Sequence, residues 1–207
     1  MELIRPTTVK DLSEGDTHLA RLELERDRLV AAGQHALAAR TSASPLHPAN
    51  AAGYFSYADG VKGLRVENLG DNWQFFRSEG VEGICNEKLN LRVLFANVLE
   101  ACGEVSPQAR SRKGAGSERV ACGDMFDVAG IDLPVSVVRF HGDYKTYYLM
   151  VDQNGAMELS LPIVKGGNFL RCIERIFLID GNDLDEIDFG VDEPADESDL
   201  DIVVTRK

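Results

Sequence analysis

Hydrophobic and polar residues alternate most regularly between residues 133 and 161, a pattern typical of β-strands. Two pairs of turn-forming residues, Gly142-Asp143 and Asn154-Gly155, interrupt this stretch. Glycine and asparagine accept the positive φ angles that two-residue hairpin turns require. The pattern therefore predicts three antiparallel strands joined by two hairpins, a β-meander. Apolar residues fall on both faces of this sheet, so we expect both faces to be at least partly covered.

Residues 86–102 show the spacing of an amphipathic helix. Apolar side chains recur at positions i, i+3, i+4, i+7 and i+11, namely Leu91, Leu94, Phe95, Val98 and Cys102. Asn86 is a suitable N-terminal cap, and Gly103 stands just beyond the other end. The spacing predicts a helix that covers one face of the meander.

A second segment with helical spacing, residues 168–179, follows the meander. Its apolar residues fit one helix face, and we expect this helix to cover the other face of the sheet. The same segment is also compatible with a fourth strand, paired through the turn Gly166-Gly167. In that arrangement Arg175 would face Glu158.

The N-terminal region is expected to form a helical arm. Residues 15–40 carry a narrow apolar stripe on a highly charged surface, which predicts one helix, or two broken near Gly33. The stripe consists of Leu19, Leu22, Leu29 and Val30. Residues 41–53 lack periodicity and form the best linker, while 54–77 contain short β-prone pieces with Trp73 as a core anchor.

Charge is distributed unevenly along the chain. The net charge is −12, but residues 180–207 contain 11 acidic and 2 basic residues, which leaves 23 acidic and 20 basic residues for the rest. The interpretation is an α+β protein: a helical arm and linker over residues 1–53, a core domain with an antiparallel β-meander packed by helices over 54–180, and an acidic C-terminal tail over 181–207. The nearly balanced body does not argue against nucleic acid, although the net charge of the whole chain does.

The stretch 109–119, with sequence ARSRKGAGSER, combines basic residues with two glycines ahead of a predicted helix start. Exposed amides at a helix start, a permissive glycine turn and guanidinium groups are the elements of an anion site. The stretch matches neither a P-loop nor a dinucleotide-binding fingerprint. A second polar group lies at the first hairpin of the meander. The residues expected to contact an anion are Arg110, Arg112, Lys113, Ser117, Arg119, Arg139, His141, Tyr144 and Lys145.

No arrangement in the sequence predicts catalysis or metal binding. His141 could serve as a base, but the predicted strand pairing places no carboxylate to orient it, so no catalytic residue is assigned. The four cysteines stand at least 17 residues apart and match no metal-binding spacing, which favours buried, reduced thiols. We expect neither a cofactor nor a metal.

These features favour a non-enzymatic accessory protein that contacts nucleic acid through the basic glycine loop and the sheet end, modulated by the acidic tail. One alternative is an interaction module whose tail or helical arm docks on a basic protein partner. Another is a small enzyme acting on a phosphate-bearing ligand. The N-terminal helix is also compatible with a homo-oligomer. No apolar run approaches membrane-spanning length, so we expect a cytoplasmic protein with no membrane partner.

Overall fold

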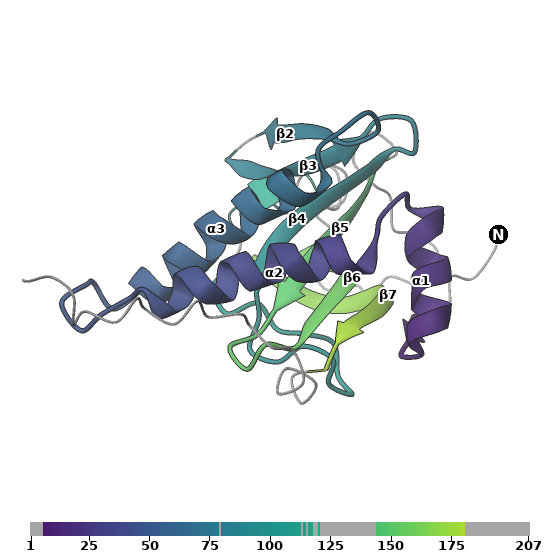
Figure 1. Ribbon diagram of the computed structural model, residues 1–207. Helices are drawn as coiled ribbons and strands as arrows, with labels where there is room; N and C mark the ends of the chain where they lie inside the picture. Colours follow the sequence, from purple (N-terminus) through teal and green to yellow (C-terminus); the bar gives the residue numbers. More distant parts are fainter. Residues whose placement is uncertain are drawn as a thin grey trace, which may run out of the picture.

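The computed structural model describes residues 6–78, 80–112, 114, 116–117, 120 and 144–180. Within that part of the chain, three helices cover one face of a seven-stranded sheet with the order β1-β7-β6-β5-β4-β3-β2 (Figure 1). The helices are α1 (Leu12–Arg21), α2 (Arg26–Thr41) and α3 (Ala51–Asn68). The strands are β1 (Thr7–Val9), β2 (Gln74–Ser78), β3 (Val81–Asn86), β4 (Leu91–Asn97), β5 (Lys145–Val151), β6 (Met157–Lys165) and β7 (Asn168–Ile179). The α+β class is confirmed.

The sheet is mixed, so the expectation of a purely antiparallel meander is wrong in part. β5 and β6 form the expected antiparallel hairpin, but the other neighbour of β5 is β4, which runs parallel to it. The predicted first strand, 133–141, lies outside the described residues. The hairpin loop contains five residues rather than two, because the Asp152 carboxylate accepts the N–H groups of Asn154 and Ala156 and holds a wider turn.

The helix expected over residues 86–102 is absent, and the segment forms parts of β3 and β4. β4 is buried on both faces: Val93 and Phe95 point toward the helices, while Leu94 and Ala96 belong to the core on the opposite face. A strand buried on both faces is apolar at nearly every position, so it also satisfies an i, i+3, i+4 pattern. The spacing of apolar residues therefore could not distinguish a helix from a strand in this segment.

The segment 168–179 forms strand β7, so the favoured helix is wrong and the alternative is correct. Gly166 and Gly167 have φ angles of +60° and +77° and close a two-residue turn between Lys165 and Asn168. Turns of this type join antiparallel strands and favour glycine at both positions. The hairpin brings Arg175 to Glu158, as the strand alternative predicted.

Residues 54–68, expected as short strands, belong to helix α3, whereas the strand expectation holds for β2. Trp73 is buried, as predicted for a core anchor. α3 packs closely on its neighbours because it carries glycines at the contacts. A Cβ atom on Gly60 would lie 2.6 Å from the Phe95 ring, and one on Gly63 would lie 2.8 Å from the carbonyl oxygen of Ala32 in α2.

The N-terminal region forms two helices, but they are separated at residues 22–25 rather than near Gly33. Glu23 adopts a left-handed φ of +56° at this break, and Gly33 lies inside α2 against Met157. Residues 42–50 connect α2 to α3 within the predicted linker. Leu19 and Leu29 are buried in the same hydrophobic cluster as the sheet, so the expected arm is packed along it.

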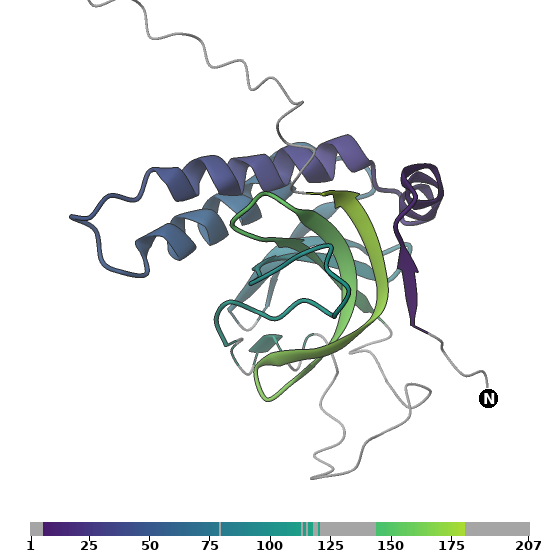
Figure 2. The same cartoon turned by 90° about the horizontal axis from the view of Figure 1, so that it is seen from below.

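Two hydrophobic cores lie on opposite faces of the sheet. One fills the space between the helices and the sheet, and the other lies beneath the curved strands β6 and β7, which arch over the segment that follows β4 (Figure 2). The β6–β7 pairing contains three register shifts. Such bulges bend and twist strands, which accounts for the curvature. No helix in the described ranges is long and apolar enough to cross a membrane, and the acidic tail lies outside those ranges.

The Gly63→Ala variant tests the close packing of α3 on α2. The new methyl group would meet backbone atoms of Ala32 at 2.8 and 2.9 Å, so the helices must move apart. We expect a loss of about 1–3 kcal/mol in the free energy of unfolding, despite the better helix propensity of alanine. Urea denaturation followed by circular dichroism measures the change.

Gly53→Ala is the matched control in the same helix, because a Cβ atom there meets nothing within 4 Å. This variant should be as stable as the original chain or slightly more stable. Equal stability of the two variants would contradict the close helix contact.

Candidate anion-binding cavity

A cavity of about 560 Å³ opens where strands β3 and β4 separate. Their pairing runs from Asn86–Leu91 to Gly83–Leu94, whereas β4 continues to Asn97. Val81 and Glu82 line the cavity from β3, and Phe95 and Asn97 line it from β4. Leu94, Phe95 and Tyr148 also border the cavity, although each is at most 2% exposed. Its size lies in the range of small-molecule sites.

Three arginines, which we call the arginine cluster, border the cavity. Arg40 comes from the last turn of α2, and Arg110 and Arg112 come from the segment after β4. In the described part of the chain, none of the three forms an ion pair with a carboxylate. Burial lowers the pKa of Arg40, and the positive charge of Arg110 lowers it further. The cluster thus concentrates positive charge, and no carboxylate among the described residues is paired with it.

The N-terminus of α3 also faces the cavity, through Ala52 and Gly53. The first N–H groups of a helix lack intrahelical acceptors and carry partial positive charge. The N-cap residue, Asn50, makes no capping hydrogen bond with its side chain. An anion beside the arginine cluster would therefore also experience the positive end of an 18-residue helix.

Asn97 fixes the relative positions of the parts that surround the cavity. Its side-chain N–H₂ donates to the carbonyl oxygen of Gly53 at 3.0 Å, and its side-chain oxygen accepts from the Ser56 hydroxyl at 2.7 Å. Its backbone carbonyl accepts the N–H of Arg110 at 3.0 Å. The Arg110 guanidinium in turn donates to Gln153 at 2.9 Å. One residue therefore joins the start of α3, the end of β4 and the basic segment.

Two tyrosines and one carboxylate complete the wall of the cavity. Tyr54 is 65% exposed, so its ring is available for stacking, whereas Tyr57 is half-buried. Burial raises the pKa of Tyr57, and the charge of Glu82 raises it further. The Glu82 carboxylate forms ion pairs with Arg65 at 2.9 Å and Arg77 at 3.0 Å. Its negative charge is thus balanced outside the arginine cluster.

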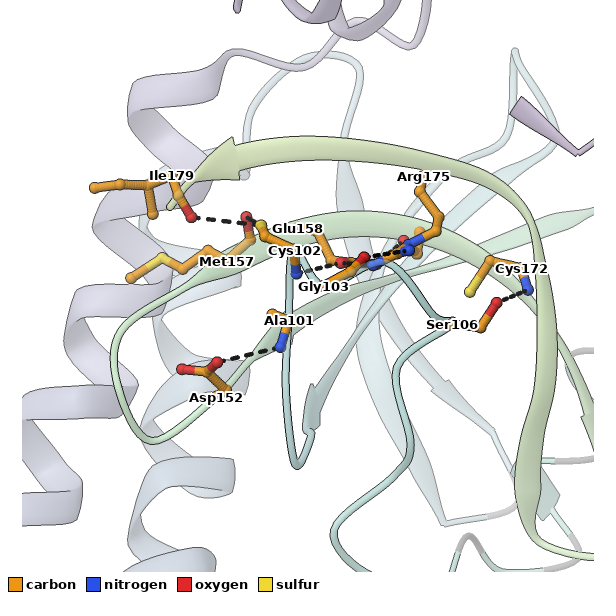
Figure 3. Close-up of polar contacts among 11 residues, drawn as sticks. Ala101, Cys102, Gly103, Ser106, Asp152, Met157, Glu158, Cys172, Arg175 and Ile179 are labelled. Carbon is orange, nitrogen blue, oxygen red and sulfur yellow. Dashed lines mark hydrogen bonds and ion pairs between the residues drawn. The ribbon is translucent and has the colours of Figure 1, made fainter. Parts of the chain in front are cut away.

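The segment between β4 and Arg110 is fixed by a buried polar cluster, which Figure 3 shows between the two curved strands and the loop beneath them. Glu158 is fully buried and binds Arg175 through both carboxylate oxygens, at 2.6 and 3.0 Å. The same carboxylate accepts the N–H of Cys102 at 2.7 Å, and Arg175 donates to the carbonyl of Gly103 at 2.9 Å. Ser160 donates a further hydrogen bond to Glu158. The ion pair thus joins β6, β7 and the loop.

Further contacts hold the same loop to the hairpin and to β7. The N–H of Ala101 donates to Asp152 at 3.1 Å, and the Ser106 hydroxyl accepts the N–H of Cys172 at 3.1 Å (Figure 3). Cys102 adopts a left-handed φ of +57°, and its thiol donates to the carbonyls of Met157 and Ile179. These contacts satisfy polar groups that the loop brings beneath the sheet.

The cysteines show no sign of reactivity. Cys85, Cys102 and Cys172 are free thiols, and Cys122 lies outside the described residues. Burial raises the pKa of Cys172 to about 12 and also raises that of Cys102 and Cys85. Thiols in this state are poor nucleophiles and poor metal ligands. The described residues contain no cluster suited to a metal ion.

The predicted anion-binding residues separate into two groups. Arg110, Arg112 and Ser117 line the cavity. Tyr144 and Lys145 lie at the start of β5, about 20 Å from the end of that strand, where Gln153 holds Arg110. The Thr146 hydroxyl in β5 donates to the carbonyl oxygen of Val120 at 3.2 Å, so the chain three residues after Ser117 reaches the sheet end. Lys113, Arg119, Arg139 and His141 lie outside the described residues.

Tyr144 packs against Arg92 at the sheet end. Its ring lies 4.1 Å from the Arg92 guanidinium, and the Phe76 ring lies 4.6 Å from the same guanidinium. Arg92 thus lies between two aromatic rings at the sheet end.

Sequence reasoning missed several residues that define the cavity. Arg40 is the last residue of a predicted helix, and Asn97 lies in a segment interpreted as a helix. Neither pattern indicated that these residues lie near the basic loop. Tyr54 was assigned to a strand. The one signal that pointed to the site was the local density of basic residues and glycines after Ala109.

The Glu158→Gln variant tests the role of the buried ion pair. Loss of the negative charge leaves Arg175, of which only 4% is exposed, without a charged partner. We expect a loss of about 3–5 kcal/mol in the free energy of unfolding, measured by urea denaturation. Glu25→Gln removes an exposed partner of Arg28 and should change stability little. A similarly small loss for Glu158→Gln would show that the buried pair is not required.

Comparisons with models of protein families, with curated proteins and with solved structures found no match to this chain. A function is therefore inferred from the contacts, charges and shape of the cavity.

Proposed function

We propose that the protein is a non-enzymatic binding protein that holds a phosphate-bearing ligand, single-stranded nucleic acid, in the cavity between β3, β4 and α3. The observation that carries the proposal is the convergence on one cavity of the N-terminus of α3 and three arginines, none of which is paired with a carboxylate among the described residues. Guanidinium groups and helix N-termini are the groups that proteins use most often to hold phosphates.

The shape of the site favours a single strand over a duplex. The arginine cluster borders a single cavity whose wall includes the exposed ring of Tyr54, whereas recognition of a duplex backbone requires basic residues spread over an extended surface. A single strand can direct a phosphate toward the arginines and place a base against an exposed ring such as Tyr54. Because the chain up to residue 179 is close to charge balance, we expect a short contact rather than a long track.

The composition of the cavity wall favours binding rather than catalysis. Its described residues include no histidine and no cysteine, and its carboxylate, Glu82, is held in ion pairs with Arg65 and Arg77. General acid–base catalysis requires a group that can exchange a proton near the reacting atoms. Arginine stays protonated and therefore serves to hold an anion.

Replacing the arginines tests the proposal. We expect the full chain to bind fluorescently labelled single-stranded DNA or RNA at low salt, as measured by anisotropy, and to bind a duplex of the same length more weakly. Arg40→Ala and Arg110→Ala should each weaken binding by about tenfold, because each removes a charge-assisted hydrogen bond. Each phosphate contact that is lost should also reduce the slope of log affinity against log salt by about 0.7.

The matched control is Arg28→Ala, which removes an arginine from the same helix as Arg40. Arg28 is exposed, pairs with Glu25 and does not line the cavity. The Arg28→Ala variant should leave the affinity for the labelled strand unchanged.

Competition by a mononucleotide distinguishes a site that binds a free nucleotide from a site that needs a strand. If the full chain does not bind at low salt, or if Arg28→Ala weakens binding as much as Arg40→Ala does, the proposal fails.

A further inference from the structure

We infer that the cavity has an intramolecular ligand: the segment Asp183–Phe189 of the acidic tail occupies it and competes with the nucleic acid. This inference names a regulation of the proposed site and therefore rests on the proposed function for its biological meaning. The docking itself depends on the cavity and the tail alone, and it can be measured without nucleic acid.

The point where the tail begins lies close to the cavity. Ile179, the last residue of β7, is paired with Met157 of β6, which is paired with Val151 of β5, which is paired with Asn97 of β4. Asn97 lines the cavity. Three strand spacings separate Ile179 from Asn97, a distance of about 15 Å. The segment begins four residues after Ile179 and ends ten residues after it, so an extended chain covers about 13–33 Å.

The chemistry of the segment matches that of the cavity. Its sequence, DLDEIDF, supplies four carboxylates in seven residues and intersperses them with Leu184, Ile187 and Phe189. In the described part of the chain the arginine cluster has no carboxylate partner, and the exposed ring of Tyr54, with Ala49 and Ala52, gives the cavity wall an apolar surface. A tail that only kept the protein soluble would not need apolar residues among its acids. The acidic and the apolar residues of the segment therefore both have a counterpart in the cavity.

Attachment to the same chain makes this contact effective even if it is weak. Because the segment is tethered about 15 Å from its site, its effective concentration is of millimolar order. Nucleic acid must displace it, so the apparent affinity falls in proportion to the fraction of molecules with an open cavity. The distal part of the tail, which carries another acidic cluster from Asp192 to Asp201, is farther from the cavity along the chain.

The experiment compares two full-length variants with the same change in charge. The proximal variant carries Asp183→Asn, Asp185→Asn, Glu186→Gln and Asp188→Asn. The distal variant carries Asp196→Asn, Glu197→Gln, Asp199→Asn and Asp201→Asn. Phenylglyoxal modifies accessible arginines, and peptide mass spectrometry reports the rate at each site. We expect Arg40, Arg110 and Arg112 to react severalfold faster in the proximal variant than in the original chain, with Arg28 unchanged as an internal reference.

The results test the docking of the tail and the proposed function separately. Unchanged reactivity of the arginine cluster in the proximal variant, or equal acceleration in the distal variant, overturns docking of Asp183–Phe189. If the cluster is protected and the proximal variant also binds labelled single strands about tenfold more tightly, the tail competes for the site. If the cluster is protected but neither chain binds nucleic acid, tail docking stands and the proposed function fails.

Discussion

The arrangement of this protein depends on the buried ion pair between Glu158 and Arg175. A fully buried carboxylate is costly unless its charge is matched and its lone pairs are satisfied. Here Arg175 provides the matching charge. The Ser160 hydroxyl and the N–H of Cys102 donate further hydrogen bonds to the two oxygens of the Glu158 carboxylate. Because these partners come from two strands and a loop, the full set of contacts forms only when the β6–β7 hairpin is in register and the loop lies beneath it.

The buried ion pair also helps to position the cavity residues, because it holds the loop that follows β4. The loop held by Glu158 and Arg175 continues directly to Arg110, whose backbone binds Asn97. Asn97 also binds the start of α3 through Gly53 and Ser56. The cationic segment and the helix N-terminus are therefore positioned by one connected set of hydrogen bonds. A site whose groups are held in place before binding loses less entropy when the ligand arrives.

The sequence allowed the α+β class and the β5–β6 hairpin to be predicted. Asn154-Gly155 marks the position of the hairpin turn, although Asp152 holds a wider loop than the two residues expected. β4 was misassigned because its burial on both faces is a property of the whole sheet. The interpretation of β7 shows how such cases can be decided: Gly166-Gly167 is a strong hairpin signal, and the possible match between Arg175 and Glu158 was a more specific argument than apolar spacing.

The cavity was harder to predict than the fold because its residues come from distant parts of the chain. Arg40 and Arg110 approach each other only after α2 has packed on the sheet and the loop has been fixed by the buried pair. Burial lowers the pKa of Arg40, and the positive charge of Arg110 lowers it further, so an anion beside both arginines would favour their charged forms. Any anion that binds the folded form alone also stabilises it. Contact between the acidic tail and the arginine cluster would bring opposite charges together and lower the electrostatic energy of both.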